Sequence, residues 1–190
     1  MRTIPVRRVL AAAGLLVAAA LGTSAGVSAA AAGQPSCAVT WGSLERANDS
    51  RSTAALANVR TGPHDCYDRV VLDFTGPATG YDVGYADQVL SEGRGEPLTV
   101  AGGARLRVAL QEPAYDVETG APTFAHAAGD HVAGVAGDRT LRDVVFGGTF
   151  EGHTTLAIGV RARLPFRVLT LPGPGAGSRI VIDVAHRWSA

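Results

Sequence analysis

The sequence contains no lysine, and neither sign of charge dominates it. All 17 basic residues are arginines, and 17 aspartate and glutamate residues balance them. A protein dedicated to nucleic acid carries a strong basic excess, because its phosphate contacts need cations. The composition therefore argues against a nucleic-acid partner.

Signatures of zinc hydrolases and of triad enzymes are also missing. The five histidines are scattered along the chain, and none belongs to a His-Glu-x-x-His motif. A catalytic zinc needs His and carboxylate ligands that converge on a metal with an open coordination position. No serine is accompanied by an evident His and Asp. We therefore expect that the chain is not an enzyme and holds neither a metal nor a cofactor.

The densest group of ionisable residues is His64, Asp65 and Asp68. Two interpretations stay open for it: a metal or acid–base cluster, or side chains that hydrogen-bond a turn beside a cysteine. We favour the turn. His126 and His131 lie in an irregular stretch, where a metal role is the weaker interpretation.

The N-terminus does carry the pattern of a secretory signal peptide. Three arginines come first, the apolar and small residues 9–21 follow, and cleavage after Ala29 or Ala32 suits signal peptidase. The alternative is a membrane span, but such a span needs about 20 strongly apolar residues. No Leu-led box of small residues precedes a cysteine, so no lipid anchor is expected. Removal of residues 1–32 would leave 14 basic and 17 acidic residues, a net charge of −3, on a secreted or envelope-located chain.

Only two cysteines are present, Cys37 and Cys66. In an exported protein such a pair most often forms a disulfide. Closing a loop of about 30 residues stabilises a protein by roughly 3–4 kcal/mol in the chain-entropy model. A metal site or a reactive thiol is the weaker alternative, because no Cys-x-x-Cys motif is present. We expect the bridge to pin an irregular N-terminal segment, residues 33–67.

From Asp68 onward, apolar residues recur at every second position, which is typical of half-buried strands. The alternating runs, separated by Gly and Pro turn signals, are 69–74, 105–110, 156–164, 166–171 and 179–184. Several short strands with frequent turns predict an all-β sandwich or barrel over residues 68–190. Residues 111–138 lack this regularity, and we expect them to form a long, mobile excursion between two halves.

Two of these runs echo each other. Residues 69–74 and 179–184 both read Arg, three aliphatic residues, Asp and an apolar residue. Within one strand the Arg and the Asp share a face but stand about 13 Å apart, so they cannot pair. If the two strands are antiparallel neighbours, we expect the Arg of one to pair with the Asp of the other. The plainer interpretation is that the resemblance only reflects common strand composition.

Several pieces of the sequence, taken in order, resemble the AMIN domain, and more closely the AMIN-like domain of actinobacterial exported proteins. These pieces are residues 41–43, 59–74, 80–85, 164–168 and 179–184, so the resemblance covers most of residues 41–188. It implies a β-sandwich of two short sheets. AMIN domains accompany cell-wall amidases and secretion-pore proteins and are linked to peptidoglycan binding and envelope localisation. Because this sequence shows no catalytic domain after the module, unlike the amidases, we expect their wall-targeting role to transfer only weakly.

Arginines that alternate with core residues are the candidate binding groups. We expect Arg105, Arg107, Arg161, Arg163 and Arg167 to contribute to a shared solvent-facing sheet, where their forks suit carboxylates and phosphates. Peptidoglycan stem peptides and teichoic acids supply both groups. Aromatic side chains that could stack on sugar rings are Tyr81 and Tyr85, together with Trp41 and Tyr67. The alternative is an ordinary solvated sheet face with aromatic residues in the core.

Two functions follow from this pattern. The first is a module that binds wall glycan or an anionic wall polymer, and an exposed groove of Arg and Tyr would favour it. The second is an extracytoplasmic protein-interaction or sensor-like domain, which docks an envelope protein without touching glycan. A long uncovered edge strand or a flat apolar patch would favour the second function.

Overall fold

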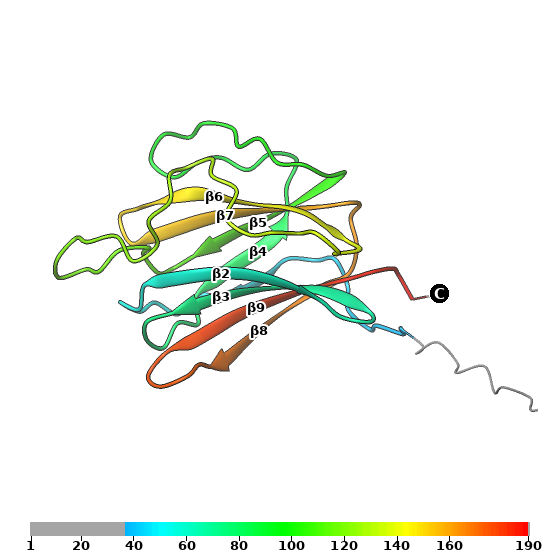
Figure 1. Ribbon diagram of the computed structural model, residues 1–190, viewed down its shortest axis with the longest axis horizontal. Helices are drawn as coiled ribbons and strands as arrows, with labels where there is room; N and C mark the ends of the chain where they lie inside the picture. The colour runs from blue at the N-terminus through cyan, green and yellow to red at the C-terminus, as the bar shows by residue number, and fades with distance from the viewer. Residues whose placement is uncertain (1–36, 190) are drawn as a thin grey trace, which may run out of the picture. The chain divides into compact units, whose positions relative to one another are not determined.

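The computed structural model describes residues 37–189, and within them every regular element is a β-strand. The strands form two antiparallel sheets that stack on each other (Figure 1). Sheet A contains, in spatial order, β1 (Arg46–Asn48), β4 (Tyr81–Tyr85), β5 (Ala104–Leu110), β7 (His153–Val160) and β6 (Leu141–Phe150). Sheet B contains β2 (Leu56–Pro63), β3 (Tyr67–Phe74), β9 (Ser178–Ala185) and β8 (Phe166–Pro172). The expected β-sandwich is confirmed.

The predicted signal peptide, residues 1–32, lies outside the described residues, so it stays a prediction. Within residues 37–189, no helix is long and apolar enough to cross a membrane.

The core lies between the two sheets and is filled by alternate residues of their strands. Sheet B contributes Val70, Leu72, Ile180 and Ile182, and sheet A contributes Leu106, Val108, Leu156 and Ile158. Full burial of one such side chain contributes roughly 1.5–3 kcal/mol. Because the side-chain period of a strand is two, the residues between these positions point to the outer faces of the sandwich.

The echoed runs form the two central strands of sheet B. β3 and β9 are antiparallel neighbours, and their register places Arg69 opposite Asp183 and Asp73 opposite Arg179. Arg69 donates from Nε and Nη2 to the two carboxylate oxygens of Asp183, at 2.6 and 2.9 Å. This confirms one of the two expected cross-strand pairs. Asp73 pairs instead with Arg60 of β2, at 2.9 Å.

The N-terminal segment is more regular than expected. Residues 33–67 were predicted to be irregular, but β1 and the eight-residue strand β2 lie within them. A register shift between Leu56 and Asn58 hides β2 in the sequence. Because of this bulge, Leu56 and Val59 both face the core although they are three residues apart. The disulfide between Cys37 and Cys66 is present, as expected.

A long segment between β4 and β5, residues 86–103, covers the outer face of sheet A (Figure 1). Val89 and Val100 pack there on Val145 of β6 and Ala157 of β7. The two layers approach so closely that a Cβ at Gly159 would lie 1.9 Å from the Ala101 carbonyl oxygen. The outer face of sheet A is therefore covered over β6 and β7.

The excursion 111–138 is irregular, as expected, but it is built into the fold. Phe124 and Ala114 belong to the core between the sheets. Val132 donates its N–H to the Val144 carbonyl, and Phe146 donates its N–H to the Asp130 carbonyl, so the segment pairs with the edge strand β6. These contacts close one side of the sandwich.

Candidate functional site

The predicted arginine-bearing face does not form as expected. Arg105 and Arg107 point outward from sheet A, as predicted, and Arg107 pairs there with Asp82 at 2.9 Å. Arg161 and Arg163, however, lie on the connection between β7 and β8, because β7 ends at Val160 rather than continuing to Leu164. At that point the Arg161 N–H bonds the Thr140 carbonyl outside the sheet.

The other predicted residues fall in two further places. Tyr81 and Tyr85 turn inward and pack, half-buried, against the core. Arg167 lies on the outer face of sheet B. The binding roles of the seven residues stay predictions, but they do not share one sheet face.

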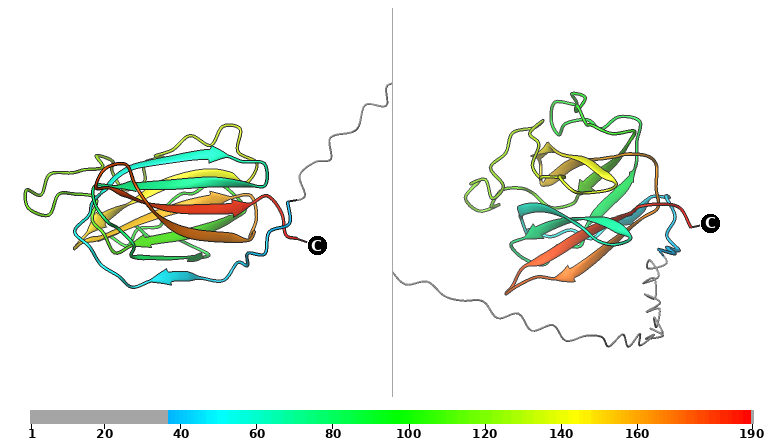
Figure 2. Two further views of the ribbon diagram at one scale, coloured as in Figure 1. Left: turned by 90° about the horizontal axis from the view of Figure 1, so that it is seen from below. Right: turned by 45° about the vertical axis from the view of Figure 1, so that its right-hand side comes forward.

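A different arginine-bearing surface is formed by the outer face of sheet B, which we call the open face. In Figure 2 (left) the four strands of this sheet lie in front, and no further layer of the described residues covers them. The register of the strands places three rows side by side on this face. Across β3, β9 and β8 the rows are Arg69–Asp183–Arg167, Val71–Val181–Leu169 and Asp73–Arg179–Leu171, and β2 adds Arg60 beside Val71.

The open face has an apolar centre and charged margins. Val71 and Val181 are only 5% and 2% exposed, although no second layer lies over them. Four arginines stand around them against two aspartates, whereas the whole chain has equal numbers of basic and acidic residues. The open face is therefore a local concentration of positive charge.

The carboxylate of Asp183 orders one margin of the open face. Its side chain is fully buried and accepts from Arg69 on one side and from Arg167 Nε, at 2.8 Å, on the other. Hydrogen bonding to Asp183 raises the pKa of Arg69 above its ordinary value, against the effect of burial. One carboxylate thus fixes two guanidinium groups that remain partly exposed, which prepares them for a second anionic partner.

Aromatic rings extend the same margin. Trp41 and Tyr67 meet edge to face, with centroids 5.6 Å apart, and the Arg167 guanidinium carbon lies 4.2 Å from the Trp41 ring centroid. His64 stacks on Tyr67 at 4.6 Å. Two bonds hold residues 37–45, which we call the Trp41 segment, against sheet B. They are the disulfide at Cys37 and the hydrogen bond from the Phe166 N–H to the Gly42 carbonyl, at 2.9 Å.

Most of this surface was missed from the sequence, although a signal for it was present. Arg60, Arg69 and Arg179 were not among the predicted binding residues. The echo of Arg-x-x-x-Asp contained two of them, since an Arg and an Asp four apart share one face of a strand. The echo was interpreted only as a pairing signal.

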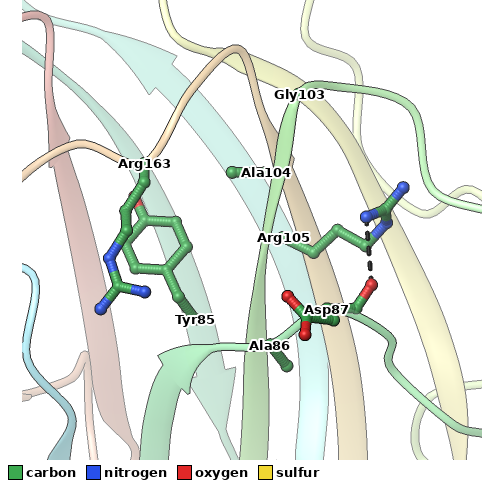
Figure 3. Close-up of a pocket in the computed structure, with 7 residues that line it drawn as sticks. All are labelled: Tyr85, Ala86, Asp87, Gly103, Ala104, Arg105 and Arg163. Atoms are coloured by element: carbon green, nitrogen blue, oxygen red, sulfur yellow. Dashed lines mark hydrogen bonds between the residues drawn. The ribbon is translucent and has the colours of Figure 1, made fainter.

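A second polar feature is a cavity of about 230 Å³ near the edge of sheet A (Figure 3). It brings together three predicted residues, Tyr85, Arg105 and Arg163, with Asp87. The Arg163 guanidinium carbon lies 5.0 Å from the Tyr85 ring centroid. The Tyr85 hydroxyl accepts from the Leu164 N–H and donates to the Leu164 carbonyl, both at 2.8 Å, so this wall of the cavity is fixed.

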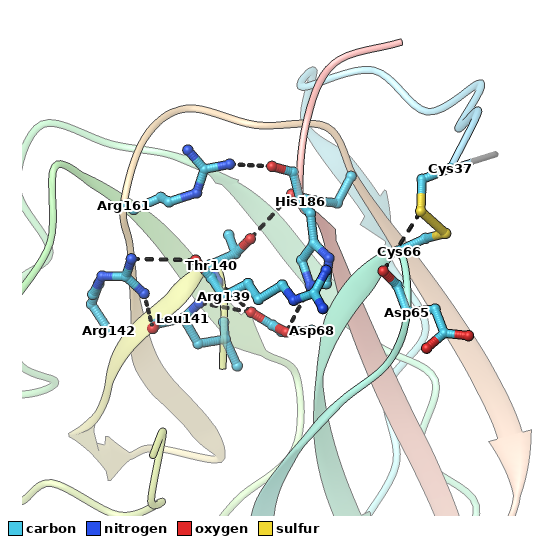
Figure 4. A network of polar contacts seen from close by, with 11 residues as sticks. Cys37, Asp65, Cys66, Asp68, Arg139, Thr140, Leu141, Arg142, Arg161 and His186 are labelled. Atoms are coloured by element: carbon cyan, nitrogen blue, oxygen red, sulfur yellow. Dashed lines mark hydrogen bonds and ion pairs between the residues drawn. A yellow bond between two sulfur atoms is a disulfide. The ribbon is translucent and has the colours of Figure 1, made fainter. Parts of the chain in front are cut away.

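The favoured interpretation of His64, Asp65 and Asp68, that they hydrogen-bond a turn beside a cysteine, does not hold for Asp68. Asp68 is fully buried, and its carboxylate accepts from the N–H groups of Thr140 and Leu141 and contacts His186 Nε2 at 2.9 Å (Figure 4). His64 lies outside this buried network, and its ring stacks on that of Tyr67. The buried network ties the segment before β6 to β3 and to the end of β9. Burial, with a smaller contribution from the charge of Asp68, raises the pKa of nearby Asp138.

The remaining histidines make local contacts. His131 Nδ1 lies 2.7 Å from Asp143 of β6, and this hydrogen bond raises the pKa of His131. His126 lies 3.7 Å from Asp130. Among the described residues, no group of three or more His, Cys, Asp or Glu side chains is arranged to hold a metal ion.

Comparison with known proteins agrees with the resemblance seen in the sequence. The family model of the AMIN-like domain matches residues 54–186, which include all strands of the sandwich except β1. The chain belongs to the AMIN-like family. Membership relates it to the AMIN domains of cell-wall amidases and indicates an envelope-associated domain. An AMIN-like domain with a disulfide is consistent with an extracytoplasmic location. No curated protein matches the chain in sequence.

Proposed function

We propose that this AMIN-like chain is a non-catalytic, exported domain that binds an anionic polymer of the cell wall, such as peptidoglycan or teichoic acid, through the open face. The observation that carries the proposal is the concentration of four arginines on one uncovered sheet face. Such a face must meet either water or a ligand. Arginine forks match carboxylates and phosphates, which repeat along wall polymers.

The geometry of the open face suits a repeating ligand better than a small one. A flat sheet offers no enclosure, and each exposed contact between an arginine and an anion contributes at most about 1 kcal/mol. Useful affinity therefore requires several contacts at once along one polymer. The Trp41 and Tyr67 rings at the margin add apolar surface on which a sugar ring can pack.

A non-catalytic role is supported by how the ionisable side chains are used. Asp68 and His186 hold a buried connection, and Asp143 with His131 anchors the excursion 111–138 to β6. These pairs stabilise the fold, and we assign them no reaction.

Sedimentation with purified cell walls tests this proposal. We expect the protein to pellet with the walls and to be released by added salt, because exposed charges are screened over about 8–10 Å at physiological ionic strength. Replacing Arg60 and Arg167 together by Gln lowers the charge of the open face by two and should release the protein. The matched control replaces Arg94 and Arg142 by Gln as well. These two arginines are exposed and lie outside the open face, so this variant should pellet as the wild type does.

Equal pelleting of both double variants would overturn the open-face proposal. A wild type that never pellets would favour the second candidate function, a protein-interaction domain. The observation behind that alternative is that β8 forms an edge of sheet B and carries Leu169 and Leu171 beside Arg167. An edge strand can accept a strand from a partner.

A further inference from the structure

The cavity beside Tyr85 is lined by three charged groups, Arg163, Arg105 and Asp87, and none of them forms an ion pair within residues 37–189. Neither Arg163 nor Asp87 forms an ion pair with another described residue, although seven such pairs occur elsewhere within residues 37–189. Both side chains are exposed and both line the cavity, with Asp87 and Arg163 on different sides of it in Figure 3. They are available to a ligand.

Neutral contacts hold the Arg163 guanidinium in place. It donates from Nε to the Ser43 hydroxyl and from Nη2 to the Ser43 carbonyl, both at 3.2 Å, and it lies over the Tyr85 ring. None of these partners is an anion, so the positive charge stays uncompensated. An oriented but unpaired guanidinium is a ready site for a carboxylate.

Asp87 is held through its main chain rather than its carboxylate. Arg105 donates from Nη1 to the Asp87 carbonyl oxygen at 3.2 Å, as the dashed line in Figure 3 shows. The Asp87 carboxylate makes no hydrogen bond to another described residue. Arg105 is therefore a positioning residue, and the carboxylate is left for a cationic group.

We propose that this cavity binds the zwitterionic end of an α-amino acid, with the ligand carboxylate at Arg163 and its ammonium group at Asp87. A simple cation would be repelled by Arg163 and Arg105, and a simple anion would leave the Asp87 carboxylate without a partner, so a ligand with both charges fits best. The volume of about 230 Å³ accommodates a small amino acid or the end of a longer branch. Two exposed charge contacts give weak binding, on the order of tens of millimolar. This site is separate from the open face and does not depend on it.

Amide chemical shifts during titration of the purified protein with small probes test the proposal. Glycine should shift the amides around Tyr85, Asp87 and Arg105. N-acetylglycine, glycinamide and inorganic phosphate, which each lack one of the two charges, should bind about fivefold more weakly. Equal binding of glycine and N-acetylglycine, or glycine with no effect at these amides, would overturn it. Nε-acetyl-lysine carries the same zwitterion on an acylated branch. If it binds as glycine does, the site accepts a zwitterionic end that carries an acylated branch, and if it does not, the site selects small amino acids.

Two substitutions separate the assigned roles. Asp87→Asn should abolish the preference for glycine over N-acetylglycine while leaving weak carboxylate binding, whereas Arg163→Gln should abolish both. Asp49→Asn and Arg142→Gln, which make the same charge changes at exposed positions outside the cavity, should change neither. A preference that survives Asp87→Asn would refute the ammonium assignment. The Arg60 and Arg167 double variant should still bind glycine, so a failure of the wall-binding proposal would leave this one intact.

Discussion

The outer faces of the two sheets are finished in different ways. The outer face of sheet A is covered over β6 and β7 by the segment 86–103, and the contact between them is apolar, around Val145 and Ala157. The open face of sheet B has no cover, and its apolar centre is bordered by arginines and aspartates. The same alternation of side chains therefore produces a second small core on one side and a charged surface on the other. The difference indicates that the outer face of sheet B is the larger surface left free for a polymer.

The largest effect should come from placing a charge on each face. Val145→Asp puts a carboxylate where the exposed fraction is zero, so we expect a loss of about 3–5 kcal/mol in the free energy of unfolding. Leu169→Asp, on the half-buried margin of the open face, should cost less than about 1 kcal/mol. Urea unfolding of both variants measures the two costs. Similar losses would show that the open face is buried in the folded protein.

A second contrast concerns how the segments beside the two sheets are held. Apolar contacts hold the segment 86–103, whereas the Trp41 segment depends on the bridge between Cys37 and Cys66. Replacing both cysteines by Ser should lower the free energy of unfolding by roughly 3–4 kcal/mol in the chain-entropy model. It should also change Trp41 fluorescence before global unfolding. The amides of Val89 and Val100 should be as protected from hydrogen exchange, relative to the most protected amides of the protein, as they are in the wild type. Early loss of protection there would mean that the two segments are coupled.

The smallest effect should come from removing Arg60, the partner of Asp73 on the open face. Burial alone would raise the pKa of Asp73. Hydrogen bonds from Arg60 and Asn58, together with the positive charges of Arg60 and Arg179, lower this pKa below its ordinary value of 3.8. A carboxyl group with a lowered pKa in the folded state stabilises the protein above the unfolded pKa, and this stability is lost as the pH falls through the folded pKa. Because the pair is partly exposed, Arg60→Gln should remove less than about 1 kcal/mol near neutral pH, and little once the pH has fallen below the folded pKa of Asp73. A loss that grows towards low pH would contradict this assignment.

The fold was largely predictable because alternation is a local signal. The matching Arg and Asp positions of 69–74 and 179–184 predicted that these two strands are neighbours, and Arg69 does pair with Asp183. β2 was missed because a bulge brings Leu56 and Val59 to one face and breaks the period of two. The packing of the excursion 111–138 into the core was not predicted, because Phe124 is a single large apolar residue among small and polar ones.

The candidate sites were harder to predict, because a surface is made by strands that are distant in the sequence. The prediction assumed that the arginines of residues 105–107 and 161–163 belong to one face, but β7 ends at Val160. Which arginines share the open face depends on the register of β2, β3, β9 and β8, which no local pattern determines. The cavity likewise joins the end of β4 to the connection between β7 and β8.

Amide chemical shifts on adding soluble wall fragments test the central claim most directly, with excess glycine present so that the Arg163 cavity is occupied. If the open face binds wall polymer, the largest changes will follow β3, β9 and β8, around Arg69, Arg167 and Arg179, and will disappear at high salt. The segment 86–103 and β6 will stay unchanged. Changes concentrated on the covered side of sheet A, or no change at any amide of sheet B, would contradict the account.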